Sequence, residues 1–193
     1  MAATWVVVLA GGESRRFGSD KLAADLGGRT LLDTTLAAVP ADLPVLVVGP
    51  PRAVRRSVEF VREEPPGGGP AAALVAGLSA ALAAGAERIS TLPGDAPAAG
   101  TAVPALLEAL GESDLVVAEA ADGQIYPLQL ACTSAGVRRI LEAAGPSLGS
   151  GASVRRLLES LEPAPRRVVL APLALQDVDT PGDLSRIGEG PTA

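Results

Sequence analysis

The segment from Leu9 to Lys21 has the residue types expected of a loop that binds polyphosphate. It reads Leu-Ala-Gly-Gly-Glu-Ser-Arg-Arg-Phe-Gly-Ser-Asp-Lys. Gly11 and Gly12 allow backbone N–H groups to come close to an anion. Arginine binds phosphate oxygens through two parallel hydrogen bonds, and lysine supplies a compact positive charge. Arg16 and Lys21 therefore suit a triphosphate whose negative charge grows on the leaving pyrophosphate.

Two common nucleotide-binding patterns fit this segment poorly. The Walker pattern has four residues between its glycines and ends in Gly-Lys-Ser/Thr, whereas five residues separate Gly12 from Gly18 and Ser19 follows. A dinucleotide fingerprint needs Gly-x-Gly-x-x-Gly, but Gly11 and Gly12 are adjacent. The simpler alternative, a tight turn with a solvated charged face, is disfavoured for the segment as a whole.

Two acidic turns are candidates for binding a metal ion. Pro93–Pro97 places the Asp95 carboxylate on a rigid turn directly after an apolar strand, where Mg²⁺ bridging phosphate oxygens would need a ligand. Asp177 and Asp179 share one side of a short extended piece, because alternate residues of such a piece share a face. Asp179 can instead cap the helix predicted to begin at Pro181.

Short apolar runs that end at glycine or proline predict the strands that carry these loops. Val6–Leu9 is continuous and β-branched, as expected for a strand covered on both faces. Further strands are predicted at residues 45–48, 58–61, 89–92, 115–118, 126–131 and 168–170. Helices are predicted at residues 31–39 after a Thr30 cap, 70–85, 102–110, 135–144, 154–161 and after residue 181.

Strands that alternate with helices at this spacing predict an α/β fold, with a mostly parallel sheet and helices on both faces. We expect one domain over residues 1–193. Ligands of such sheets bind beyond the carboxyl ends of the strands. The loops at 10–21 and 93–97, which follow the first and fourth strands, should therefore face one crevice.

Composition excludes several classes of protein. The formal charge of -6, from 22 acidic and 16 basic residues, argues against a nonspecific binder of nucleic acid or anionic membranes. A single cysteine, Cys132, and no histidine exclude an intramolecular disulfide framework and ordinary structural zinc sites. The apolar run Trp5–Ala10 is too short for a signal or membrane-spanning segment, so a cytoplasmic location is expected.

The run from Leu9 to Lys21 resembles the signature of the nucleotidyltransferase superfamily, and most closely that of the molybdenum cofactor guanylyltransferases. Phe17 stands where that family usually has methionine. The resemblance extends from Val6 to Leu184 and implies a three-layer, Rossmann-like nucleotidyltransferase fold. It implies nucleotide binding by Leu9, Ala10, Gly11, Gly12, Arg16, Lys21 and Glu63, catalysis by Arg16, Lys21 and Asp95, and Mg²⁺ ligation by Asp95 and Asp179.

The activity implied by the resemblance is transfer of GMP from GTP to the terminal phosphate of molybdopterin carrying molybdenum, with release of pyrophosphate. A carboxylate can accept both N1–H and the exocyclic amine of guanine, which makes Glu63 the candidate for base selection. Glu64 is the alternative, and the family usually has aspartate here. A flexible proline-glycine linker with solvated glutamates is the simpler interpretation of residues 63–71.

The acceptor side is less specific. Tyr126 lies where relatives have a His-Pro or similar pair, and Arg155 or Arg156 can bind the phosphate of the pterin or simply face solvent. Transient contact with molybdoenzymes or cofactor-insertion proteins is expected. Alternative functions are a CTP:molybdopterin cytidylyltransferase, a phospholactate or sugar-phosphate guanylyltransferase, or a noncatalytic nucleotide-binding module. Cytidylyl relatives tend to carry Ala-Gly at Gly11-Gly12.

Overall fold

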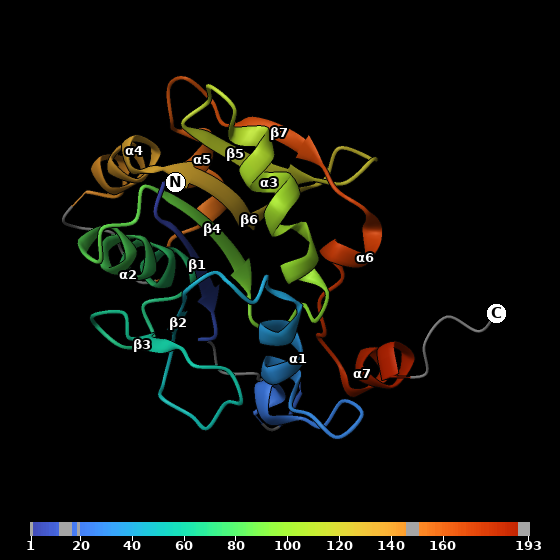
Figure 1. Cartoon of the computed structure of the whole chain (residues 1–193). Coiled ribbons are helices and arrows are strands. Elements are labelled where there is room, and N and C mark those ends of the chain that lie inside the picture. Colours follow the sequence, from blue (N-terminus) through green and yellow to red (C-terminus); the bar gives the residue numbers. More distant parts are fainter. Residues whose placement is uncertain (1, 12–16, 19, 146–150, 189–193) are drawn as a thin grey trace.

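The structure is a computed structural model, and it describes residues 2–11, 17–18, 20–145 and 151–188. Seven strands of these residues form one sheet in the order β3-β2-β1-β4-β6-β5-β7, with helices on both faces (Figure 1). Strand β6 is antiparallel to β4 and β5, and the other neighbouring strands are parallel. The strands are β1 (Thr4–Leu9), β2 (Val45–Val48), β3 (Glu59–Val61), β4 (Arg88–Pro93), β5 (Leu115–Glu119), β6 (Ile125–Thr133) and β7 (Arg166–Val169).

The helices form two layers, one on each face of the sheet (Figure 1). One layer contains α2 (Pro70–Ala83), α4 (Ser134–Ala144) and α5 (Val154–Glu159). The other contains α1 (Leu31–Ala38), α3 (Val103–Leu110) and α6 (Pro172–Leu175). Helix α7 (Pro181–Gly188) follows α6, and two short 3-10 turns, η1 (Lys21–Ala23) and η2 (Ala99–Ala102), complete the described helices.

Strand β1 shows why the sheet is covered on both faces. Val7 packs in the cluster with α2, whereas Val6 and Val8 pack in the cluster with α1, and all three are fully buried. Gly77 lets α2 come close to the sheet, since a Cβ there would lie 2.5 Å from Val7 Cγ1 and 2.7 Å from Val48 Cγ2. No aromatic side chain is among the buried residues that the structure describes, and at Gly77 the packing depends on close backbone approach.

The α/β class and the mostly parallel sheet predicted from the sequence are confirmed, and every predicted strand has a counterpart. Thr30 caps α1 as expected, accepting a hydrogen bond from Asp33 N at 3.0 Å. The sequence prediction missed helix α6, because its four residues are too short to show a helical period. It also missed the two 3-10 turns for the same reason.

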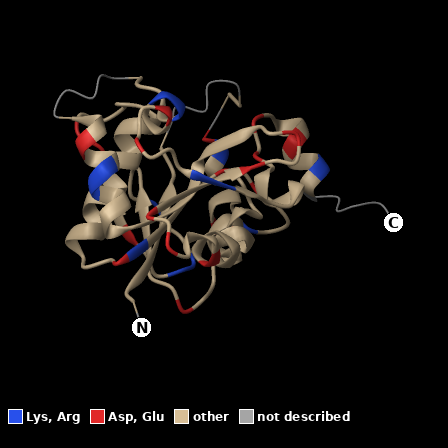
Figure 2. Ribbon diagram, turned by 90° about the horizontal axis from the view of Figure 1, so that it is seen from above, with Lys and Arg blue, Asp and Glu red and all other residues tan. Residues whose placement is uncertain are grey.

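Basic and acidic residues are interspersed around the described chain (Figure 2). Within the described residues, no helix is both long and apolar enough to cross a membrane. One local cluster of charge is formed where Lys21 meets Asp95 and Asp179.

Candidate nucleotide and metal site

The loops after β1 and β4 meet at one edge of the sheet, as the sequence predicts. Leu9 and Pro93 are register partners at the ends of these parallel strands. Gly94 N donates to Leu9 O at 2.8 Å. A Cβ on Gly94 would lie 3.2 Å from the same carbonyl oxygen and 3.3 Å from Ala10 Cα, so a larger residue would push the two loops apart.

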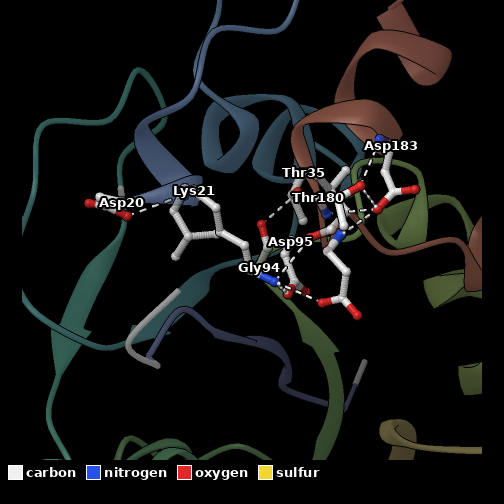
Figure 3. A network of polar contacts seen from close by, with 10 residues as sticks. Asp20, Lys21, Thr35, Gly94, Asp95, Thr180 and Asp183 are labelled. Atoms are coloured by element: carbon white, nitrogen blue, oxygen red, sulfur yellow. Dashed lines mark hydrogen bonds and ion pairs between the residues drawn. The ribbon is translucent and has the colours of Figure 1, made fainter. Parts of the chain in front are cut away.

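Lys21, the chain's only lysine, joins these loops to the segment before α7. Its Nζ lies 2.5 Å from Asp95 Oδ2 and 3.4 Å from Asp179 Oδ1, and it donates to Val178 O at 3.0 Å. Figure 3 shows the Lys21 side chain extending toward Asp95 beside Gly94. The charged groups of Lys21, Asp95 and Asp179 thus lie together, although the three residues are far apart in the sequence.

The protonation of Lys21 reflects its neighbours. Burial alone lowers the pKa of its ammonium group, but the hydrogen bond and charge of Asp95 and the charge of Asp179 outweigh burial and raise the pKa. Lys21 is therefore a permanent cation at neutral pH. An ammonium ion held by two carboxylates shows that this pair can accept a positive charge.

A buried threonine holds the turn that carries Asp95. Thr35 is fully buried in α1, and its hydroxyl donates to Gly94 O at 2.9 Å, a contact drawn in Figure 3. Thr35 was not among the residues predicted from the sequence. A hydroxyl among the apolar residues of a helix is the signal that could have found it, because a buried hydroxyl needs a partner.

The segment before α7 places Asp179 differently from a helix cap. Thr180 Oγ1 accepts from Asp183 N at 3.2 Å, and Asp183 Oδ2 accepts from Thr180 N at 2.7 Å. This reciprocal pair caps α7, so the alternative in which Asp179 is the cap is wrong. Val178 N donates to Asp95 O at 2.9 Å, which ties the segment directly to the turn after β4.

Asp177 and Asp179 lie in different surroundings. Of these two aspartates, only Asp179 lies within ion-pair distance of Lys21 in the described structure, at 3.4 Å. Burial, followed by the negative charges of Asp95 and Asp179, raises the pKa of Asp177. The geometry therefore favours Asp179 over Asp177 as the carboxylate that accompanies Asp95.

Glu63 lies close to the loop that follows β1. Its side chain is buried, Oε1 accepts from Gly67 N at 3.0 Å, and Oε2 is buried with no hydrogen-bond partner among the described residues. A Cβ on Gly11 would lie 3.9 Å from Oε1. Glu64 is exposed, so the geometry distinguishes the two glutamates. A packed turn, rather than a linker, carries Glu63.

A cavity of about 500 Å³ lies beside the segment that joins α6 to Asp177. Tyr126 and Asp177 both line it, so one wall is aromatic and another carries a carboxyl group. Its remaining lining residues are Ala120, Pro172, Leu173, Leu175 and Gln176. The residues of α6 were not predicted to line a site, because α6 itself was not predicted.

Four further predicted residues have different outcomes. Gly12 and Arg16 lie outside the described residues, so their positions are not part of the geometry above. Arg155 Nη2 donates to Ile125 O at 3.1 Å, which gives it a structural partner on β6. Arg156 is exposed, and its backbone N–H donates to the Ser153 cap.

The fold and this edge of the sheet define the class of protein: an α/β fold of the nucleotidyltransferase type, with a glycine-rich loop and carboxylates at the carboxyl ends of parallel strands. Residues 6–171 match the family model of the MobA-like NTP transferase domain. The chain belongs to this family.

Known proteins similar to this chain agree with that assignment. A molybdenum cofactor guanylyltransferase of Cereibacter sphaeroides is 37% identical over 127 residues, which are 63% of this chain and 64% of that protein. The matched region thus spans somewhat less than two thirds of this relative. A nucleotidyl transferase from Methanothermobacter is 27% identical with a TM-score of 0.73, covering 97% of this chain and 96% of that one.

A third similar protein was solved with a metal. Rv0371c of Mycobacterium tuberculosis H37Rv, in complex with manganese, superposes with a TM-score of 0.64 and 24% identity. The match covers 98% of this chain and 100% of that chain. At this identity the likeness shows the common fold.

Proposed function

We propose that this protein transfers GMP from GTP to the terminal phosphate of molybdopterin carrying molybdenum, forming the guanine dinucleotide cofactor and pyrophosphate. The observation that carries the proposal is the 2.5 Å contact between Lys21 Nζ and Asp95 Oδ2 at the ends of β1 and β4. In this proposal, the contact unites the two loops that take part in nucleotide transfer. The names of the curated relatives support the acceptor.

In the proposed reaction, an oxygen of the acceptor phosphate forms a bond to the α-phosphorus of GTP. The bond from that phosphorus to the bridging oxygen breaks, and pyrophosphate leaves with the electron pair. A phosphate monoester dianion is already nucleophilic at neutral pH, so the chain needs no general base. The protein contributes by aligning the two phosphates and by stabilising negative charge.

The basic residues of the loop bind the triphosphate in this proposal. In this proposal the backbone N–H groups that bind the polyanion begin at Gly11, because Ala10 N already donates to Val48 O at 2.8 Å, and Arg16 and Lys21 stabilise the leaving pyrophosphate. In this proposal Lys21, which contacts the Asp95 and Asp179 carboxylates, turns toward the phosphates when GTP binds. Its length and single-bond rotations permit such a movement.

The carboxylates fit a divalent metal. Asp95 and Asp179 already hold one cationic group, and carboxylate oxygens are the ligands that Mg²⁺ prefers. Among the described residues, no three His, Cys, Asp or Glu side chains lie close enough together to hold a metal ion. Mg²⁺, when bound, would be held by Asp95 and Asp179 and supply positive charge beside the phosphate oxygens.

Guanine selection is assigned to Glu63. Its buried Oε2 has no partner in the part of the chain that the structure describes, and a buried acceptor without a partner is costly unless a ligand supplies a donor. Guanine offers N1–H and an amine to one carboxylate, whereas adenine and cytosine do not offer this pair of donors. We expect Glu63→Gln to lower the preference for GTP over CTP, while Glu64→Gln, on the exposed neighbour, leaves it unchanged.

The cavity lined by Tyr126 and Asp177 supports an acceptor with a ring. An aromatic wall stacks on a flat heterocycle, and a carboxyl group pairs with N–H donors. Other acceptors, and CTP as the donor, remain the alternative functions. A noncatalytic nucleotide-binding module is the remaining alternative, and the family assignment and the Lys21–Asp95 contact disfavour it.

The decisive experiment is mass spectrometry of the products formed from Mg-GTP, Mg-CTP or Mg-ATP with molybdopterin, phospholactate or a sugar phosphate. We expect the guanine dinucleotide only from GTP with the pterin. A product from CTP would overturn the base assignment, and a product with another phosphate would overturn the acceptor. The absence of pyrophosphate release with every pair would contradict the enzymatic function.

A further inference from the structure

Arg52, in the segment between β2 and β3, contacts the loop at residues 10–21 that follows β1. Arg52 Nη1 lies 2.7 Å from Asp20 Oδ2, where Asp20 directly precedes Lys21. The other oxygen of Asp20 accepts from Leu22 N at 3.2 Å and so caps the 3-10 turn η1. The two carboxylate oxygens therefore have different partners: one caps the turn that begins with Lys21, and the other binds Arg52.

The segment that carries Arg52 is itself firmly anchored. Arg56 donates from its guanidinium to four backbone carbonyls at the end of α1 and just beyond it, those of Leu36, Val39, Pro40 and Leu43, at 2.6–3.0 Å. Arg55 N donates to Asp33 Oδ1 at 2.8 Å. Arg52 therefore extends from a fixed support and can hold Asp20 in one place.

The electrostatic setting suggests why such a support is needed. Asp20 puts a negative charge inside a loop that is proposed to bind a polyanion, and it is adjacent to Lys21 in the sequence. An unpaired carboxylate there would repel the triphosphate and compete for the cations of the loop. The guanidinium of Arg52 offsets this charge.

Stability alone does not explain the arrangement. The Asp20 side chain is 52% exposed, and exposed ion pairs contribute little to folding. The Nε of Arg52 is buried and has no hydrogen-bond partner among the described residues, which costs free energy. The guanidinium of Arg52 thus binds Asp20 through Nη1, while its Nε has no hydrogen-bond partner among the described residues.

We propose that Arg52 is a positioning residue for triphosphate binding: through Asp20 it fixes the turn that presents Lys21, and it cancels the negative charge of Asp20. This inference rests on the proposed function, because it assigns the same loop to the phosphates of the nucleotide. Arg52 itself need not touch the substrate.

The test measures binding of inorganic tripolyphosphate by calorimetry without divalent metal, so it depends on neither the base, the acceptor nor turnover. An exposed ion pair is worth up to ~1 kcal/mol, so Arg52→Met should weaken binding about three- to fivefold. Arg52→Lys keeps the charge and should recover most of this loss. In an Asp20→Asn background, where the charge to be offset is gone, Arg52→Met should change the affinity by less than about 1.5-fold.

Arg55→Met is the matched control. Arg55 lies in the same segment and donates from Nη2 to Gly28 O at 2.8 Å, but it has no described contact with Asp20 or Lys21. It should leave tripolyphosphate affinity unchanged even if it lowers the melting temperature. If Arg52→Met does not fold, Arg52→Gln also removes the charge, and its affinities with and without Asp20→Asn provide the same comparison.

Three results would overturn the positioning role: no binding of tripolyphosphate by the unaltered protein, equal losses in Arg52→Met and Arg55→Met, or an undiminished loss in the Asp20→Asn background. The product assay with GTP and the pterin tests the proposed function separately. A protein that bound tripolyphosphate through Arg52 but made no guanine dinucleotide would retain this inference and lose the proposed activity.

Discussion

The two halves of the sheet hold their functional residues in different ways. In the parallel half, formed by β3, β2, β1 and β4, the strand ends are joined by short polar contacts, such as Lys21 to Asp95 at 2.5 Å. In the mixed half, formed by β6, β5 and β7, the register of β5 against β6 shifts after Val117. An open cavity lies beside that half, lined by Tyr126 and the residues of α6.

In the proposed function, this difference separates catalysis from binding of the acceptor. Parallel strands end at a common edge, so their loops converge on one point and can place charges within a few ångströms. An antiparallel strand with a bulge re-aims its side chains and opens space instead. We therefore expect substitutions in the parallel half to affect catalysis and those in the mixed half to affect acceptor binding.

Asp95→Asn is the most severe test of this division between the halves. The amide keeps the size of the side chain but removes the charge that meets Lys21, and we expect turnover to fall by about 10³-fold, as for loss of a preorganised electrostatic group. Pyrophosphate release from Mg-GTP with the acceptor measures it. Asp114→Asn is the control, since Asp114 pairs with Arg139 at 2.5 Å in the mixed half and should keep most of the activity.

Lys21→Met examines the charge at the centre of the parallel half. Without nucleotide, Lys21 occupies the carboxylates, so its removal should tighten binding of Mn²⁺ by about tenfold, equivalent to ~1.4 kcal/mol. Electron paramagnetic resonance of free Mn²⁺ provides the readout. GTP affinity should fall in the same variant. Lys21→Arg retains the charge and should bind Mn²⁺ as weakly as the unaltered protein. Equal Mn²⁺ affinity in the unaltered protein, Lys21→Met and Lys21→Arg would show that Lys21 does not compete with the metal for the carboxylates.

Tyr126→Ala probes the mixed half. Loss of the aromatic wall should raise the KM for the acceptor roughly five- to tenfold, a typical cost for removing a buried aromatic contact. The KM for GTP should stay within about twofold, because that contact does not touch the donor. Tyr126→Phe retains the ring and should behave like the unaltered protein. A change confined to the KM for GTP would reverse the assignment of the two halves.

Cys132 reports on the seam between the halves, and here the smallest effect is expected. It is fully buried on β6, with register partners Ile89 of β4 and Leu115 of β5. Burial, and then the nearby Asp114 charge, raises the pKa of its thiol far above the physiological range. A disulfide reagent should leave the native protein unlabelled at about pH 8 and react after unfolding in urea. Rapid labelling of the native state would show that the seam opens.

The fold was accessible from sequence because its signals are local. Val45–Val48 is a strand with the predicted bounds, and α2 begins at Pro70 as expected. Helix α6 escaped because four residues show no period. The antiparallel direction of β6 also lies beyond a local pattern, since strand direction depends on which neighbours it joins.

The candidate site was accessible only in part. The motif from Leu9 to Lys21 and the Pro93–Pro97 turn were predicted to meet at one edge of the sheet, and the parallel pairing of β1 and β4 brings the ends of these strands together there. The role of Asp179 as a cap was left open by sequence and decided by Thr180 and Asp183. Arg52 gave no local signal at all, because its partner lies 32 residues away.

Local patterns along the chain were enough to predict the strands, the longer helices and the aliphatic core, and they predict a loop suited to polyphosphate. These properties arise from hydrophobic period, turn residues and the short reach of glycine and charge. Which charges meet depended on the folded arrangement of the sheet. Lys21 and Asp179 are 158 residues apart in the chain, yet their charged atoms lie 3.4 Å apart, because the segment before α7 is tied to the turn after β4 by the hydrogen bond from Val178 N to Asp95 O at 2.9 Å.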